Sequence, residues 1–364
     1  MPFLIVERLA EYDERHLNEL VADMLEASGL QWRGKKVLVK PNLLGPFAPD
    51  SAVVTHPSLI RAVSRQLHNA GCSVIVGDNP GIRGYGMVAK TATVSGAGEA
   101  AGEDFLNLTL RPRKFELNSR FAKSVSISSE ILEADILVSL PKLKTHMATI
   151  ITGGVKNSYG FVVGADKTRL HAAAPRHEDF GELIADIYAI RPPDLVIMDA
   201  IIGMEGNGPS GGKIREIGCL MASDNAGAVD LAICGMTGLN PLKVATQRTI
   251  MARGLSPSSL QEVDVRGEIP FLPNFRIPAN LMRLDPWGLG HKIISRRLAR
   301  PQIKVDKSKC IACGACAENC PVSAIEVVNY PTFDYNQCIS CYCCYEICPE
   351  GALRVGGLMR LLRH

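Results

Sequence analysis

The chain has 364 residues, of which 46% are hydrophobic and 21% are charged, and its formal net charge is +3. This composition is typical of a globular protein large enough for two domains, and no apolar run approaches the roughly 18 residues that would cross a membrane. The charge is too small for general nucleic-acid binding, and the N-terminal segment has no export signal, which predicts a cytoplasmic protein.

Residues 1–275 are predicted to alternate strands with helices. Strands are expected at 37–40, 73–76, 135–140, 195–198 and 217–222, because each is a short apolar run bounded by turn residues. Helices are expected from Pro57 to Gly71, over 180–188 and over 226–236, where apolar residues keep helical spacing. Residues 77–102 are expected to be a loop with a short helix. This order favours an α/β domain with a mostly parallel sheet and helices on both faces.

Polar side chains gather where these strands end. Ligands of open α/β sheets bind beyond the carboxyl ends of the strands, so the sequence predicts a site there. The last strand is expected to end at the same edge, on Asp224. Four residues are expected to be catalytic and six to bind the ligand or cofactor, and these are Lys142, Lys144, His146 and Asp199, then Lys40, Asn42, Asp78, Lys156, Asn157 and Glu205.

The residue types at this predicted site indicate an anionic ligand. Lysines suit a carboxylate or phosphate, and the pairs Gly153-Gly154 and Gly211-Gly212 would let backbone N–H groups approach an oxyanion. The acids could also hold a metal with His146 or His171. The competing interpretation is that charges such as Lys142 and Asp199 only neutralise each other.

Residues 276–300 are predicted to be a connector, since prolines become frequent and apolar periodicity weakens after about Leu255. The basic stretch from His291 to Arg300 is expected to pack on the next module, against acids that include Glu346. Membrane-surface binding by this stretch and by the basic C-terminal tail is the alternative.

Residues 301–364 contain two identical cysteine runs of the form C-x2-C-x2-C-x3-C-P. Each cysteine of the second run lies 28 residues after its counterpart in the first, and the runs are Cys310, Cys313, Cys316 and Cys320, then Cys338, Cys341, Cys344 and Cys348. This spacing indicates [4Fe–4S] clusters. Zinc sites usually space cysteine pairs more widely, and disulfides need an oxidising compartment.

Residues 301–355 resemble the bacterial-type two-cluster ferredoxin, in which the fourth cysteine of each run ligates the other cluster. The resemblance implies two [4Fe–4S] clusters, the first held by Cys310, Cys313, Cys316 and Cys348, the second by Cys338, Cys341, Cys344 and Cys320. Two oxidised clusters would lower the net charge to about −1. Cys343 has Ala315 as its counterpart and is expected not to be a ligand.

Four phrases of the first domain resemble the family named domain of unknown function 362. They are Lys40-Pro-Asn42, Pro141 to His146, Thr152 to Gly160, and Glu205 to Pro209. The resemblance covers residues 35–275, and a ferredoxin module commonly follows in such proteins. It implies the α/β fold and a ligand site, but no particular substrate.

These features predict an iron–sulfur redox protein that transfers electrons to or from a small anionic substrate on the α/β domain. The alternative is a non-enzymatic electron carrier or assembly factor that docks a redox partner protein. A ligase or transferase is disfavoured, because no Walker loop is present and no G-x-G-x-x-G is predicted to open a helix after a strand. A redox enzyme would need the ferredoxin module close to the strand ends, so we expect the two to be adjacent.

Overall fold

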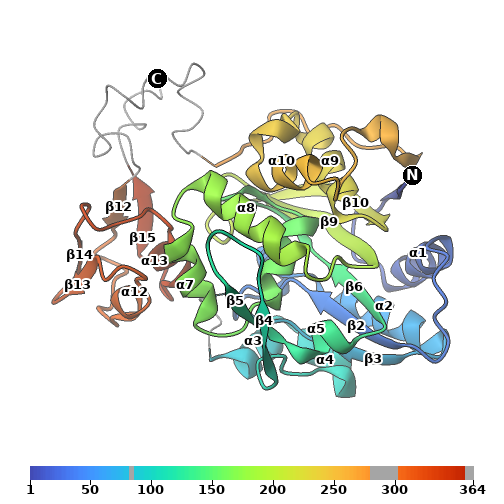
Figure 1. Ribbon diagram of the computed structural model, residues 1–364, viewed down its shortest axis with the longest axis horizontal. Coiled ribbons are helices and arrows are strands. Elements are labelled where there is room, and N and C mark those ends of the chain that lie inside the picture. Colours follow the sequence, from blue (N-terminus) through green and yellow to red (C-terminus); the bar gives the residue numbers. More distant parts are fainter. Residues whose placement is uncertain (82–85, 279–301, 357–364) are drawn as a thin grey trace.

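The computed structural model describes residues 1–81, 86–278 and 302–356, which form an α/β domain with a smaller module at one end (Figure 1). Nearly all of the predicted connector and the basic C-terminal tail lie outside the described residues, so their predicted packing stays untested. The boundary of the first domain near residue 275 likewise stays a prediction.

The α/β domain is built on one sheet, which has nine strands in the described part of the chain. Its main path is β11-β1-β10-β9-β6-β2-β3, and β7 pairs with β9 and with β8. The bounds are β1 Phe3–Arg8, β2 Lys36–Pro41, β3 Ser73–Val76, β6 Ile136–Leu140, β7 Lys142–His146, β8 Ile150–Thr152, β9 Leu195–Glu205, β10 Lys213–Ser223 and β11 Asp264–Gly267.

The sheet is mostly parallel, as predicted. Strands β3, β2, β6 and β9 run in one direction, and β10 is antiparallel to both β9 and β1. The reversal of β10 corrects one expectation, because its end at Asp224 lies at the opposite edge of the sheet. There the Asp224 carboxylate accepts a hydrogen bond of 3.1 Å from the amide of Phe3, at the start of β1.

Helices cover both faces of the sheet (Figure 1). Alternate residues of β2 point to opposite faces, so Val37 and Val39 pack with one group of helices and Leu38 with the other. The first face carries α1 (Glu14–Ala27), α2 (Pro57–Asn69) and α4 (Ala97–Ala101), and the second carries α8 (His177–Tyr188), α9 (Ala226–Thr237) and α10 (Ala245–Ala252). The smaller elements are α3 Val88–Val94, β4 Pro112–Glu116, β5 Ser124–Ser128, α5 Ser129–Glu133, α6 Gly154–Asn157 and α7 Asp166–Ala173.

Two segments differ from the sequence-based expectation. Strands β9 and β10 are each 11 residues long and form a hairpin that extends past Asp199, so the Gly-rich segment 206–212 is its turn. Residues 142–146 form strand β7 rather than a loop. Its polar side chains hide the apolar signal on which strand prediction depends.

The C-terminal module consists of short helices and four short strands, and the strands form two antiparallel pairs, β12 with β15 and β13 with β14. The bounds are β12 Gln302–Val305, α12 Ala315–Glu318, β13 Ile325–Val327, β14 Pro331–Phe333, α13 Cys343–Ile347 and β15 Leu353–Gly356. Its small core includes Ile303, Tyr342 and Leu353, and Met147 of the α/β domain packs among them. The module and the α/β domain therefore share a hydrophobic contact directly after β7.

Candidate functional site

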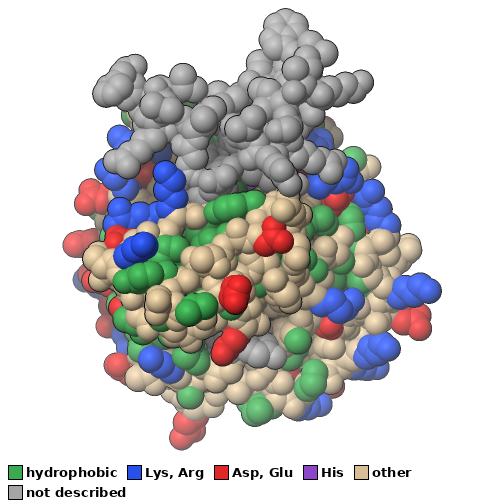
Figure 2. All heavy atoms as spheres, turned by 90° about the vertical axis from the view of Figure 1, so that its left-hand side faces the viewer, with side chains coloured by type: hydrophobic (Ala, Val, Ile, Leu, Met, Phe, Trp, Pro, Cys, Tyr) green, Lys and Arg blue, Asp and Glu red, His purple; other side chains and the backbone are tan. Residues whose placement is uncertain are grey.

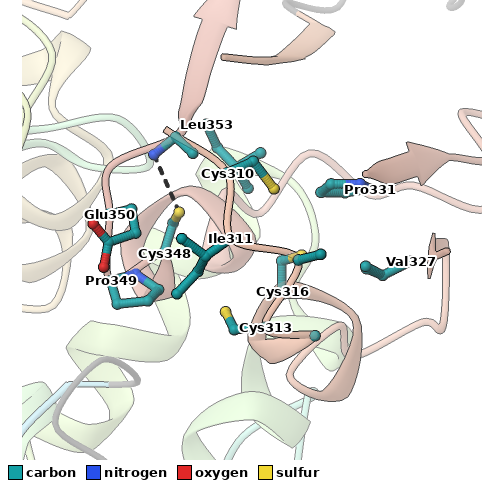
Figure 3. A pocket seen from close by; sticks show the side chains of 13 residues that line it. Cys310, Ile311, Cys313, Cys316, Val327, Pro331, Cys348, Pro349, Glu350 and Leu353 are labelled. Carbon is teal, nitrogen blue, oxygen red and sulfur yellow. Dashed lines mark hydrogen bonds between the residues drawn. The ribbon is translucent and has the colours of Figure 1, made fainter. Parts of the chain in front are cut away.

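The eight cysteines of the C-terminal module line two separate pockets. Cys310, Cys313 and Cys316 of the first run share one pocket with Cys348 of the second run, and Figure 3 shows these four side chains around one space. The other pocket is lined by Cys338, Cys341, Cys344 and Cys320. Each pocket thus takes three thiols from one run and the fourth from the other, so the residues present fit the cross-ligated arrangement of two-cluster ferredoxins.

The backbone repeats with the cysteines. Positive φ angles recur at the 28-residue offset, at Ala312 and Ser340 (52° and 56°) and at Gly314 and Tyr342 (79° and 62°). The amides of Ala324 and Ala352 each donate a hydrogen bond of 3.2 Å to a cysteine sulfur, Cys320 Sγ and Cys348 Sγ. Such N–H···S bonds stabilise negative charge on sulfur and tune cluster potentials.

Cys343 lies outside the lining of both pockets. It is 1% exposed at the start of α13, and its side chain is hydrogen-bonded to that of Cys341. This bond and burial raise the pKa of Cys343 well above its usual range. The geometry agrees with the prediction that Cys343 is not a ligand, which remains a prediction.

One group of polar residues joins β2, β3, β7 and α6 at the strand ends. Lys40 Nζ lies 2.8 Å from Asp78 Oδ1 and 3.1 Å from Asn157 Oδ1, and Lys144 Nζ lies 2.7 Å from Asn42 Oδ1. Asn42 in turn donates to Asn157 at 3.3 Å. All five are therefore connected, as their positions after the strands predicted.

Gly160 explains part of the Gly-rich phrase that follows β8. A Cβ atom at this position would lie 2.5 Å from both Lys40 Nζ and Asp78 Oδ1, so only glycine lets the backbone approach this ion pair.

A second group surrounds Asp199, and it includes two residues that the sequence analysis missed. Asp199 Oδ2 lies 3.0 Å from Lys142 Nζ and accepts a bond from the amide of His56, while Asp199 Oδ1 accepts one of 2.8 Å from the Tyr12 hydroxyl. The Tyr12 ring stacks on the His56 ring at 3.6 Å, and Lys142 also donates to the Tyr12 hydroxyl. Lys142 and Asp199 do neutralise each other, but inside the protein and not in solvent, because both are 0% exposed.

The C-terminal module contributes a residue to the strand-end region. Glu346 on α13 is 7% exposed, and its Oε1 lies 3.5 Å from His146 Nε2 of β7. The preceding residue, Tyr345, donates a hydrogen bond of 3.2 Å to the carbonyl of Asn207 in the β9–β10 turn. The module is thus adjacent to the predicted site, as expected, although the sequence analysis placed Glu346 against the basic connector.

Burial and like charges control the protonation of this interface. The pKa of Lys144 is well below its usual range because of burial and the neighbouring Lys156, and burial lowers the pKa of Lys156 to about 8. His146 has a strongly lowered pKa, first from burial and then from the two lysines. Burial raises the pKa of Glu346 to about 7 despite these lysines. Burial therefore disfavours the charged forms of Lys144, His146 and Glu346, which a bound anion would change for Lys144 and His146.

The glycine pair after β8 already faces an anion of the chain itself. The amides of Gly154 and Val155 donate to the two carboxylate oxygens of Asp230 on α9, at 2.6 and 3.3 Å. The expectation that these amides serve a ligand oxyanion is therefore corrected. Glycine is required here because a Cβ on Gly153 would collide with the Asp230 carboxylate.

Three further predicted or missed residues lie around the site. Glu205 faces Arg215 and Arg276, at 3.9 and 3.8 Å, and so belongs to a different cluster from the lysines. His171 stacks on Phe180 at 4.2 Å. Lys167, which the sequence analysis missed, donates to the carbonyls of Asn79 and Pro80.

The sequence left open a metal site of acids with His146 or His171, but no three His, Cys, Asp or Glu side chains in the described ranges converge to hold a single metal ion. Over those same ranges, no helix is both long and apolar enough to cross a membrane.

Both the α/β domain and the C-terminal module match known protein families. Residues 37–235 match the family described as domain of unknown function (DUF362), and residues 303–326 and 331–354 match a 4Fe-4S binding domain. A thylakoid-associated protein of Synechocystis is 31% identical over 262 residues, which are 69% of this chain and 79% of that protein.

Similarity to solved structures is weak. The lactate racemase apoprotein of Thermoanaerobacterium thermosaccharolyticum matches with a TM-score of 0.41 and 13% identity, over 64% of this chain and 56% of that one. A Thermotoga maritima protein matches with a TM-score of 0.38 and 13% identity, over 53% of this chain and 51% of that one. The chain thus spans little more than half of either solved structure.

Proposed function

Because the chain belongs to the DUF362 family and carries a 4Fe-4S binding domain, we propose that this iron–sulfur protein exchanges electrons with an anionic substrate bound at the strand ends. The observation that carries the proposal is the contact between Glu346 of the ferredoxin module and His146 of β7. Electron transfer falls steeply with distance, so a module that touches the site is positioned for exchange with a substrate there.

Two [4Fe–4S] clusters are part of this proposal. The cysteines of the two pockets would hold them, and the clusters supply one-electron transfer when bound. The two sequence matches and the two four-cysteine pockets support that number. Eight irons and eight sulfides per chain are expected after anaerobic preparation.

The residues of the α/β domain divide the remaining work. Lys144, Lys156 and His146 bind and orient the anion, because His146 contacts Glu346 of the module and, within the described residues, none of the three has an ion pair with a carboxylate of the α/β domain. The pair of Lys142 and Asp199 holds β7 and β9 in register. Asn42 fixes Lys144 by a direct hydrogen bond and is itself connected to Asn157, Lys40 and Asp78. Glu205 pairs with Arg215 and Arg276 beside the turn of the β9–β10 hairpin and does not act on the ligand.

The test is ligand retention. Anaerobically purified protein is denatured and the released small molecules are identified by mass spectrometry, first for the unmodified chain and then for Lys144→Ala. Loss of the retained anion with unchanged iron and sulfide supports the proposal. Equal retention by Lys144→Ala and by the exposed control Lys213→Ala would refute it.

The carrier alternative has one observation in its favour. Around the first cysteine pocket the module exposes large apolar side chains, Ile311 at 63% and Val328 at 78%. The side of the molecule that carries the module shows hydrophobic side chains with few charged ones among them (Figure 2). A redox partner protein docking there would be reduced by the loaded chain without any small substrate. Rapid reduction of a partner protein by Lys144→Ala at the unmodified rate would favour this alternative. The cytoplasmic location stays a prediction, which cell fractionation tests.

A further inference from the structure

The two cysteine runs of the ferredoxin module have identical spacing, but the helices inside them have different surroundings. Glu346 on α13 and Glu318 on α12 occupy equivalent positions, 28 residues apart, and Glu318 is exposed whereas Glu346 is 7% exposed. Their neighbours differ in size as well, with Ala317 in the first helix and Tyr345 in the second. Because Glu318 is exposed, the first helix shows that a cluster pocket can form without a buried carboxylate at this position.

Glu346 enters a region that contains two buried lysines and a histidine. His146 Nε2 is 3.5 Å from its carboxylate. Burial raises the pKa of Glu346, and the positive charges of Lys156 and Lys144 oppose that rise. Within the described residues neither lysine has a carboxylate within 4.0 Å, whereas Lys40 and Lys142 are matched by Asp78 and Asp199. One carboxylate thus faces two lysines and a histidine without forming a direct ion pair with either lysine.

This arrangement matches what a bound ligand would need. The chain supplies a carboxylate on a short side chain, at the interface where the anionic substrate is expected, and leaves lysine charge unmatched. Elsewhere in the protein a carboxylate of the chain also occupies a set of donors, since Asp230 accepts hydrogen bonds from the amides of Gly154 and Val155. A carboxylate is therefore the anion that these groups are shaped to accept.

We propose that the ligand of the strand-end site is a small carboxylate, and that it displaces the Glu346 side chain from His146 when it binds to Lys144 and Lys156. The inference rests on the proposed function and adds the substrate class and a built-in competitor. Removing the charge of Glu346 removes the competitor, so the ligand binds more tightly. The equivalent change at Glu318 leaves binding unaffected.

The experiment measures binding of malonate by isothermal titration calorimetry to three anaerobic, iron-loaded proteins. These are the unmodified chain, Glu346→Gln and the matched control Glu318→Gln, each with iron and sulfide determined beforehand. We expect malonate to bind Glu346→Gln at least about tenfold more tightly than the other two, and more tightly than inorganic phosphate. Equal or weaker binding by Glu346→Gln overturns the inference, and so does a preference for phosphate.

The outcomes separate this inference from the proposed function. If malonate binds the unmodified chain and Lys156→Ala abolishes that binding, the anion site stands even when Glu346→Gln changes nothing. If neither carboxylate nor phosphate binds any of the proteins, both ideas fail.

A second measurement uses the unmodified chain alone, in case Glu346→Gln does not load iron. Amide hydrogen exchange across 342–347 is compared with and without malonate. Faster exchange with malonate is expected, because displaced Glu346 no longer holds α13 against β7. Unchanged or slower exchange contradicts the displacement.

Discussion

Replacing Lys142 by methionine tests how much the buried pair with Asp199 contributes to stability. The two charges are 3.0 Å apart and both residues are 0% exposed. At an effective dielectric constant of about 20 their attraction is about 5 kcal/mol. Methionine fills the space of the lysine stem but, among the described residues, leaves Asp199 with only the Tyr12 hydroxyl and the His56 amide as donors. Removing one partner of such a pair typically costs about 3–5 kcal/mol.

The assay is urea unfolding of the iron-loaded protein, followed by far-UV circular dichroism without oxygen. With an m value of about 3 kcal/mol/M or somewhat more for a domain of this size, the midpoint is expected to fall by about 1 M. Lys213→Met, at an exposed position of β10, is the control and should shift the midpoint little. The double variant Lys142→Met/Asp199→Leu should recover most of the loss, since it leaves no unpaired charge. A loss below about 1 kcal/mol for Lys142→Met would refute the reasoning.

Three shorter predictions concern the module and its contact. Cys341→Ser is expected to lose or convert one cluster while Cys343→Ser keeps full iron and sulfide, and equal iron loss in both would contradict the assignment. Gly211→Val is expected to loosen the module, because a Cβ there collides with the Tyr345 hydroxyl, and hydrogen exchange across 342–347 should rise, unlike in Tyr345→Phe. Burial lowers the pKa of His171 to about 3, so the unfolded chain alone takes up a proton below pH 6.5, and stability falls as the pH drops from 6.5 toward 3. His171→Gln should flatten this dependence in urea titrations, and an unchanged slope would show that His171 does not contribute.

The α/β fold and the lysine positions could be predicted because they depend on local signals. Strand β3 and helix α2 have the expected bounds within one or two residues, since apolar runs and the His56-Pro57 start mark them directly. The positions of Lys40 and Asn42 in the site could be predicted because Lys40 ends an expected strand and Asn42 follows it.

The partners of these residues could not be predicted, because they depend on strand order. Tyr12 reaches Asp199 only because β1 lies beside an antiparallel β10. A stacked His56 gives no periodic signal, and Glu346 looks like an ordinary surface acid of a ferredoxin helix. Only the three-dimensional contact between module and sheet distinguishes it from Glu318.

The shared core around Met147 has a consequence for maturation. Ile303, Tyr342 and Leu353 are few, and a module with so small a core depends on its iron for a stable fold. The wall that Glu346 and Tyr345 provide at the strand ends is therefore completed only after iron and sulfide have been inserted. A newly synthesised chain would present an incomplete site until then, so under the proposed function we expect cofactor insertion to precede substrate binding.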